Sequence, residues 1–163
     1  KVVVGSVVVS KDGRVLMCRR AIEPRKGFWT MPAGYMELGE TLEEGAAREA
    51  LEEAEAAIAI EGILGVFSIA RIGQVQVIFR AGFADPGLPA FAPGAESLEV
   101  RLFSIEEIPW DEIAFPSVRW ALHAWRATVD RPLGHPAGNP PDDRRGVHRM
   151  TPSTATHAAD ATS

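Results

Sequence analysis

Cysteine is nearly absent from this sequence, because Cys18 is the only one among 163 residues. A single cysteine excludes an intrachain disulfide and any zinc site built on several cysteines, and it fits a reducing, cytoplasmic setting. No run of about 18 apolar residues occurs, so we expect no membrane-spanning helix and no membrane partner. The chain begins at Lys1 rather than Met, with no charged-then-apolar segment before the first expected strand, as in a fragment of a longer protein.

The negative charge of the chain is concentrated in one segment. The formal net charge is −5, whereas residues 37–55 alone hold eight glutamates and one arginine, a net of −7. The remainder therefore carries a net charge of +2, the difference between these two values. Such a balance does not indicate general nucleic-acid binding, which requires broad positive charge. It favours a local cation site, with basic residues nearby to hold an anionic substrate.

Alternating apolar segments and turn residues predict a mixed α/β domain. We expect strands over residues 2–9, 14–20, 57–70, 75–83 and 100–104, and helices over residues 41–54 and 116–129. Asp12 and Gly13 between the first two strands are typical of a hairpin turn. Thr41 and Glu44 have the spacing of a capping box, which marks the start of the first helix.

Composition changes after residue 130. Residues 130–163 hold five prolines, three glycines and three of the four histidines, with almost no large apolar side chain. Such a segment cannot bury enough apolar surface to offset the entropy lost on ordering. We therefore predict one domain over residues 1–129 and a disordered tail over residues 130–163.

The helix expected over residues 41–54 brings three carboxylates together. Glu49, Glu52 and Glu53 have i, i+3 and i+4 spacing and lie beside the apolar half of the helix. Arg48 pairs across one turn but cannot neutralise all three. Clustered carboxylates are the hard oxygen ligands that Mg²⁺ or Mn²⁺ requires, with waters and substrate phosphates completing the shell. The alternative interpretation is a solvated acidic face.

The segment before these carboxylates completes a recognisable spacing: Gly34, five residues, Glu40, seven residues, then Arg48-Glu49-Ala50-Leu51-Glu52-Glu53. This arrangement resembles the signature of the Nudix hydrolases, and the order of elements resembles that family from residue 2 to about residue 129. The family has glycine where this chain has Glu55. The resemblance implies an α/β/α sandwich with a mixed β-sheet and a loop-helix-loop metal site.

The resemblance also implies roles for particular residues. The expected metal ligands are Gly34 through its carbonyl, Glu49, Glu52, Glu53 and Glu96, and the expected catalytic set is the four glutamates with Arg48. Arg48 and Glu40 would hold the loop and the helix in register. Glu96 is included because a carboxylate after the signature often contributes in this family, and Glu99 is the second candidate for that position.

Three further segments resemble one Nudix subgroup: residues 18–20, 27–35 and 91–99. Members of this subgroup carry a small zinc ribbon before the domain and include FAD and ADP-ribose pyrophosphatases; the ribbon is not in this chain. The implied substrate is a small-molecule, dinucleotide-type diphosphate. Its diphosphate bond would be hydrolysed to AMP and a second monophosphate.

Substrate binding requires phosphate partners and stacking surfaces, which arginines and aromatic rings supply. The expected substrate-binding residues are Arg19, Arg20, Phe28, Trp29 and Arg80, with Arg71, Phe67 and Phe79 as further candidates. Because side chains alternate along a strand, at most one of Arg19 and Arg20 faces the site.

Three functions remain open at this point. The first is hydrolysis of FAD, ADP-ribose or a related compound, the second is hydrolysis of damaged nucleoside triphosphates, and the third is a catalytically idle nucleotide sensor. The intact glutamates favour an enzyme, whereas only Glu55 favours the sensor. A non-glycine residue costs about 1–2 kcal/mol in the left-handed conformation that glycine adopts at a helix end. Either the helix continues past Ala54 or Glu55 is strained; a homodimer is left open.

Overall fold

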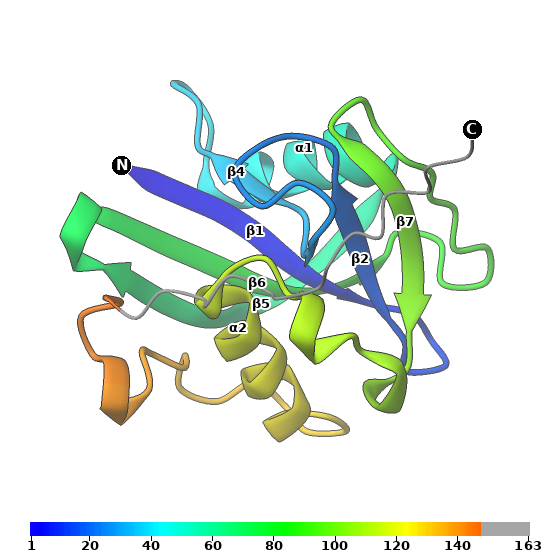
Figure 1. Ribbon diagram of the computed structural model, residues 1–163. Helices are drawn as coiled ribbons and strands as arrows, with labels where there is room; N and C mark the ends of the chain where they lie inside the picture. The colour runs from blue at the N-terminus through cyan, green and yellow to red at the C-terminus, as the bar shows by residue number, and fades with distance from the viewer. Residues whose placement is uncertain (148–163) are drawn as a thin grey trace, which may run out of the picture.

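The computed structural model describes residues 1–147, in which seven strands form one mixed sheet between two helices (Figure 1). The strands are β1 Val2–Val9, β2 Val15–Arg20, β3 Trp29–Thr30, β4 Ala33–Tyr35, β5 Ile58–Ile69, β6 Gln74–Phe83 and β7 Ser97–Phe103. The α-helices are α1 Leu42–Ala54 and α2 Pro116–Ala127, and the short 3₁₀ helices are η1 Ala70–Ile72, η2 Ile105–Glu107, η3 Trp110–Glu112 and η4 Pro141–Asp143. No helix of residues 1–147 is long and apolar enough to cross a membrane.

β1 is the central strand of the sheet. The strand order is β3-β2-β1-β6-β5, with β4 pairing to β1 and β7 pairing to β2. β1 and β6 run parallel, and the other paired strands run antiparallel. β1 reads almost entirely as valine, and such a continuous apolar run suits a strand that is covered on both faces.

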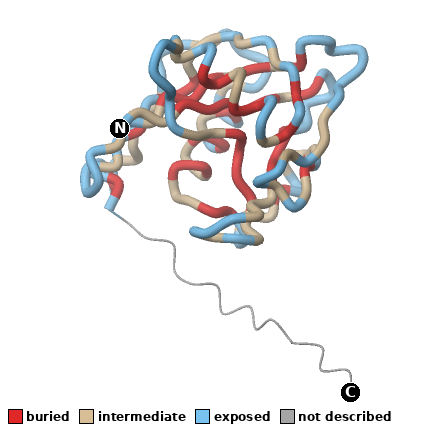
Figure 2. Tube along the Cα trace, turned by 90° about the horizontal axis from the view of Figure 1, so that it is seen from above, coloured by how far each residue is buried: buried red, intermediate tan, exposed pale blue. Residues whose placement is uncertain are grey.

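Neighbouring residues of the central strands face different helices. Val7 of β1 and Ile78 of β6 pack with Leu122 of α2 in one core cluster. Val8 of β1 packs with Ala54 of α1 in a second cluster. Because successive strand side chains point to opposite faces, α1 and α2 cover opposite faces of the sheet. The buried residues gather in the middle of the molecule (Figure 2). The predicted α/β/α sandwich is confirmed.

The sequence patterns located the long elements and missed the short ones. β3 and β4 have two and three residues, which is too few for any periodicity to show. β7 begins at Ser97, three residues before the predicted start. β4 matters for the site, because it pairs with β1 and leads the chain into α1.

α1 begins with the capping box that its sequence predicts. The Thr41 hydroxyl accepts a hydrogen bond from Glu44 N at 3.1 Å, and Glu44 Oε2 accepts one from Thr41 N at 2.9 Å. Ala46 and Ala50 are fully buried against the sheet. Leu51 was expected on the same buried half, but 53% of it is exposed. The apolar face of α1 is therefore narrower than the sequence suggested and consists mainly of alanine.

The helix ends at Ala54, and Glu55 adopts the left-handed conformation with φ 48° and ψ 32°. Glu55 N donates to Leu51 O at 3.0 Å, and Ala56 N donates to Ala50 O at 3.2 Å. These two bonds satisfy the last carbonyls in the way that a glycine-ended helix does. The helix therefore does not continue past Ala54, and Glu55 adopts the strained left-handed conformation, which was the second of the two alternatives.

Residues 131–147, the C-terminal segment, pack along the outer edge of β5, which corrects the prediction of a disordered tail for this part of the chain. Val66 N donates to Ala137 O at 2.9 Å. The Asn139 side chain continues the pairing, since it accepts from Ser68 N and donates to Ser68 O, both at 2.8 Å. An amide side chain here replaces a strand residue in the ladder.

Main-chain hydrogen bonds, rather than apolar area, hold this segment, and composition does not reveal them. Asp143 is buried, and its Oδ1 accepts from Val147 N at 2.8 Å. Leu133 and Ala137 add apolar contacts to the core cluster under α2. The part of the predicted tail from residue 148 to residue 163 lies outside the described residues.

Removing the C-terminal segment should destabilise the domain. A chain ending at residue 130 loses the bonds along β5 and leaves that strand edge unpaired. We expect it to melt about 5 °C or more below a chain ending at residue 147, which keeps every described contact. Thermal unfolding of the two chains makes the comparison. Equal melting temperatures would contradict the docking of this segment.

Replacing Glu55 by glycine should stabilise the protein. The change removes the left-handed penalty, and the greater freedom of glycine in the unfolded chain offsets part of the gain, so we expect about 0.5–1 kcal/mol. Urea unfolding measures the difference. Glu55→Ala is the control, because it removes the carboxylate but keeps a Cβ, and it should give no such gain. A destabilising glycine would contradict the strain.

Candidate metal and substrate site

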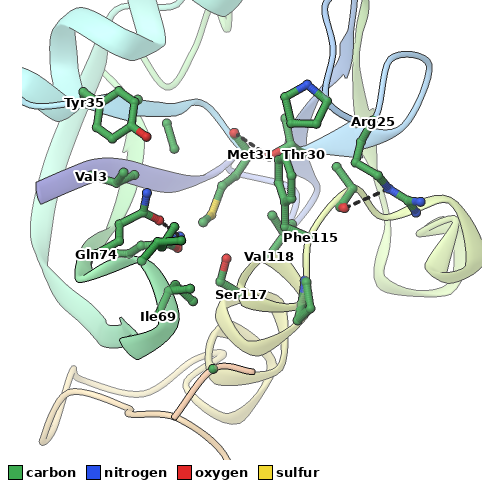
Figure 3. A pocket seen from close by; sticks show the side chains of 18 of the residues that line it. Val3, Arg25, Thr30, Met31, Tyr35, Ile69, Gln74, Phe115, Ser117 and Val118 are labelled. Atoms are coloured by element: carbon green, nitrogen blue, oxygen red, sulfur yellow. Dashed lines mark hydrogen bonds between the residues drawn. The ribbon is translucent and has the colours of Figure 1, made fainter. Parts of the chain in front are cut away.

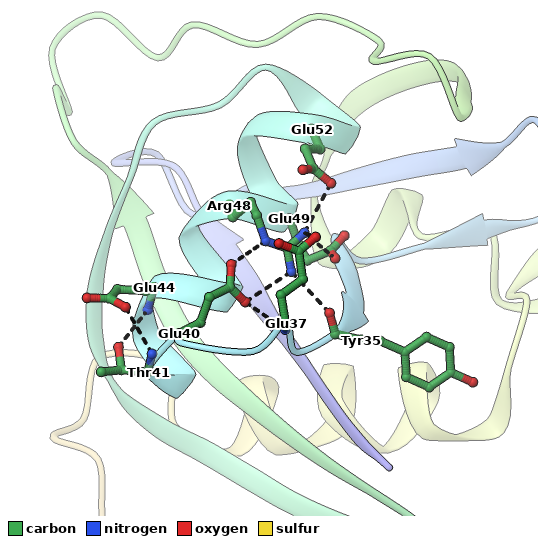
Figure 4. A network of polar contacts seen from close by, with 8 residues as sticks. All are labelled: Tyr35, Glu37, Glu40, Thr41, Glu44, Arg48, Glu49 and Glu52. Carbon is green, nitrogen blue, oxygen red and sulfur yellow. Dashed lines mark hydrogen bonds and ion pairs between the residues drawn. The ribbon is translucent and has the colours of Figure 1, made fainter.

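Arg48 joins the carboxylates of the β4–α1 loop and of α1 into one network (Figure 4). Its Nε donates to Glu40, whose pKa is lowered chiefly by this bond. Its Nη1 donates to Glu49 Oε1 at 2.8 Å and to Glu52 Oε2 at 3.1 Å. Its Nη2 donates to the Tyr35 carbonyl at 3.0 Å. The guanidinium therefore ties the loop to the middle of the helix.

Two carboxylates of α1 are withdrawn from water. Glu49 is buried, and its burial raises its pKa, to which the negative charges of Glu52 and Glu96 add. Burial also raises the pKa of Glu53, to about 8, although a hydrogen bond from Ala33 N at 3.1 Å opposes the change. Both groups are held where their ionised forms are unfavourable without a nearby cation.

The backbone of β4 lies directly against these carboxylates. A Cβ added at Gly34 would overlap the Glu49 carboxylate, so a larger residue there would displace that side chain. Gly34 pairs with Val4 of β1, which fixes its position in the sheet. The glycine of the signature is thus explained by close contact.

The donor chemistry fits a hard divalent cation, because carboxylate oxygens are its preferred ligands. In residues 1–147, however, no three His, Cys, Asp or Glu side chains already surround one point. Glu49 and Glu52 instead share Arg48, which supplies one positive charge. Glu52 is exposed, whereas Glu53 lies deeper, bonded to Ala33 N. The residues present suit a cation that competes with Arg48 for these oxygens.

Glu96, and not Glu99, belongs to this cluster. Glu96 lines a small cavity together with Glu53 and Arg20. Its charge contributes to the raised pKa of Glu49 and of Glu53. Glu99 instead pairs with one arginine of β2 and one of β7. The first of the two sequence candidates therefore faces the helix glutamates.

The loop that carries Glu96 is bonded to the last turn of α1. Gly94 N donates to Glu53 O at 3.1 Å, and the Ser97 hydroxyl donates to the same carbonyl at 2.8 Å. A Cβ at Gly94 would overlap the Glu52 carbonyl. The segment over residues 91–99, which the sequence singled out, thus places Glu96 beside the helix end.

A cavity of about 710 Å³ opens between the sheet and the start of α2 (Figure 3). This volume is in the range of small-molecule sites. Gly34 borders the cavity, so it adjoins the glutamate cluster. Arg20 lines both this cavity and the small one beside Glu53. Arg25, Arg71 and Phe115 add positive charge and an aromatic ring to the walls.

Of the five expected substrate-binding residues, only Arg20 lines this cavity. Trp29 is buried in the core, edge-on against a phenylalanine of β7. Arg80 pairs with a glutamate of β5, and Arg19 donates to a carbonyl of the following loop. Phe28 stacks under the guanidinium of Arg25 in that loop. These four side chains therefore hold structure together.

Arg71 was a further sequence candidate and does line the cavity, whereas Arg25 and Phe115 were missed. Arg25 lies in the loop after β2, and Phe115 lies just before α2. Neither carries a motif, and only the folded chain brings them together. Phe67 and Phe79, proposed as stacking rings, are buried in the core.

The comparisons with known proteins agree with this arrangement. Residues 1–151 match the family model described as the NUDIX domain, beyond the predicted domain end at residue 129. A MutT-like protein of Streptomyces ambofaciens is 42% identical over 77 residues, which cover 47% of this chain and 48% of that protein. An ADP-ribose pyrophosphatase of Methanocaldococcus jannaschii is 29% identical over 106 residues, which cover 63% of this chain and 61% of that protein.

The chain thus spans about half to three fifths of these two relatives. A solved structure of a NUDIX hydrolase from Nitrosomonas europaea is similar with a TM-score of 0.76 and 45% identity. That similarity covers 85% of this chain and 78% of the other. Because the family model covers all of the described residues, and the glutamates of the signature lie together where α1 meets β4, the chain belongs to the NUDIX family.

Proposed function

We propose that this protein is a metal-dependent pyrophosphohydrolase that cleaves a nucleoside diphosphate linked to another group, of the FAD or ADP-ribose type. One observation supports the proposal most strongly. Buried carboxylates that repel one another adjoin a cavity of small-molecule size. Arg20 lines this cavity and also the small cavity beside Glu53. A solvated acidic face would have neither the burial nor the cavity.

The residues that would hold Mg²⁺ or Mn²⁺ are the carboxylates of Glu49, Glu52, Glu53 and Glu96, together with the Gly34 carbonyl. When bound, a divalent ion would neutralise phosphate charge and lower the pKa of a water molecule, so that hydroxide forms near neutral pH as the nucleophile. Phosphoryl transfer asks little covalent chemistry of the protein, so positioning and electrostatics carry most of the catalysis.

The side chains around this position divide the work. Glu53 is held by a hydrogen bond from Ala33 N, and burial raises its pKa in the metal-free protein, so a bound cation would favour its ionised form. Arg48 keeps Glu49 and Glu52 turned toward the same side of α1. Arg20 lies between the glutamates and the large cavity, where it would contact the diphosphate oxygens.

The substrate class is supported by the cavity and by one relative. The cavity holds more than a diphosphate, so a second group can be enclosed with it. The archaeal relative is named for ADP-ribose hydrolysis. The expected products are AMP and a second monophosphate, because hydrolysis of the diphosphate bond leaves one phosphate on each half.

A substrate panel with Mg²⁺ or Mn²⁺, with products identified by mass, tests the proposal. We expect ADP-ribose or FAD to be hydrolysed to AMP faster than any nucleoside triphosphate. Faster turnover of triphosphates would support the alternative of a cleaner of damaged nucleotides. No hydrolysis of any nucleotide, with nucleotide binding retained, would support the sensor.

Glu53→Gln and Glu44→Gln are the matched variants for this panel. Glu53→Gln keeps the shape but removes the charge and the proton acceptor, so turnover should fall by about 100-fold or more. Glu44→Gln lies in the first turn of α1, where glutamine still completes the capping box, and should keep nearly full turnover. Wild-type turnover in Glu53→Gln would contradict the assigned site.

A further inference from the structure

The chain contains only two glutamines, Gln74 and Gln76, and both line the large cavity (Figure 3). They lie two residues apart on β6 and therefore point to the same face of the sheet. The next residue on that face, Ile78, is buried in the core under α2. This face of β6 thus changes from apolar to amide where the core ends and the cavity begins.

The two amides are bonded to each other. Gln76 Nε2 donates to Gln74 Oε1 at 2.8 Å. Within residues 1–147, neither the Gln74 amide nitrogen nor the Gln76 amide oxygen has a hydrogen-bond partner in the structure. Turning both amides over exchanges the partners but again leaves one nitrogen and one oxygen unpaired. In either arrangement the pair presents a donor and an acceptor to a ligand in the cavity.

We propose that Gln74 and Gln76 recognise the nucleobase of the substrate and that this base is adenine. The inference rests on the proposed function and specifies the nucleoside half of the substrate. An adenine edge pairs a ring-nitrogen acceptor with the exocyclic amine donor, and an amide donor and acceptor complement both. FAD and ADP-ribose share this half, so the inference does not depend on which of them is used.

Guanine fits the same walls less well. Its ring N–H and its 2-amino group are two donors on one edge, so a guanine site needs a second acceptor or a carboxylate. Within the described chain, no aspartate or glutamate lines the cavity. A guanine bound to the two glutamines would therefore find no carboxylate in these walls for its 2-amino group.

The position of the amide pair also suits the rest of the substrate. Phe115 supplies an aromatic face in the same cavity, and the Arg20 guanidinium lies 5.1 Å from the centre of that ring. Arg20 continues to the small cavity beside Glu53. A base held at the glutamines and a diphosphate held at Arg20 would therefore share this cavity.

Equilibrium binding of nucleoside monophosphates to the whole chain in EDTA tests this inference without any turnover. The probes are AMP, GMP and purine riboside 5′-monophosphate, which lacks the exocyclic amine of AMP. We expect the wild-type protein to bind AMP about 5- to 10-fold more tightly than either of the other two, as one or two buried hydrogen bonds allow.

Gln76→Leu should bring AMP binding down to the level of purine riboside monophosphate. Gln76→Glu keeps the length of the side chain and adds a stronger acceptor, so it should reverse the preference toward GMP. Val75→Leu alters the same strand on the opposite face and should leave every affinity unchanged. If Gln76→Leu does not fold, Gln76→Glu alone decides the outcome.

Two results would overturn the inference: equal binding of AMP and purine riboside monophosphate by the wild-type protein, or an AMP preference that survives both Gln76 variants. Neither result concerns hydrolysis. A protein that shows the expected binding but no turnover with Mg²⁺ or Mn²⁺ would keep this base site and refute the proposed function. Turnover with Mg²⁺ or Mn²⁺, together with an unchanged base preference in the variants, would support the proposed function and refute this base site.

Discussion

The burial of several carboxylates beside a single guanidinium is the constraint on which the rest of this structure depends. Arg48 forms ion pairs with four glutamates, Glu37, Glu40, Glu49 and Glu52. It bonds Glu40 in the loop before α1 and the Tyr35 carbonyl of β4, and the neighbouring Gly34 lies against Glu49. One positive charge cannot balance this set together with Glu53 and Glu96. The remaining negative charge is the physical reason for assigning a divalent cation to this place.

Two differently built regions meet at the edge of the sheet. α1 and its glutamates lie on one face, whereas the large cavity opens on the face that α2 covers. β4 borders both regions through Gly34, and Arg20 reaches both from the end of β2. The cavity also has Gly146 and Val147 in its wall, so the docked C-terminal segment helps to shape it. Under the proposed function, hydrolytic chemistry and substrate recognition would be separated across the sheet and joined at its edge.

Local features were predictable from the sequence, and features that depend on distant contacts were not. The capping box and the spacing of the signature glutamates follow from residues within one or two helical turns, whereas the sequence left open whether the helix would continue past Ala54 or end at a strained Glu55. Trp29 and Arg80 were assigned to substrate because their types suit it, but the fold commits them to the core and to an ion pair. The docking of the C-terminal segment was not predicted. Hydrogen bonds of the Asn139 side chain and of main-chain groups hold it, and amino-acid composition does not show such bonds.

The most direct test of the central claim is the melting temperature of the wild-type protein as Mn²⁺ or Mg²⁺ is added after treatment with EDTA. A cation that occupies the glutamate cluster binds only the folded state, so stability should rise with metal concentration, by about 2.7 kcal/mol at a hundredfold excess over the dissociation constant. In Glu53→Gln this rise should weaken, while the metal-free variant melts higher than the metal-free wild type because glutamine avoids the cost of burying an ionisable carboxyl group. A wild-type melting temperature that does not change with metal would contradict the account.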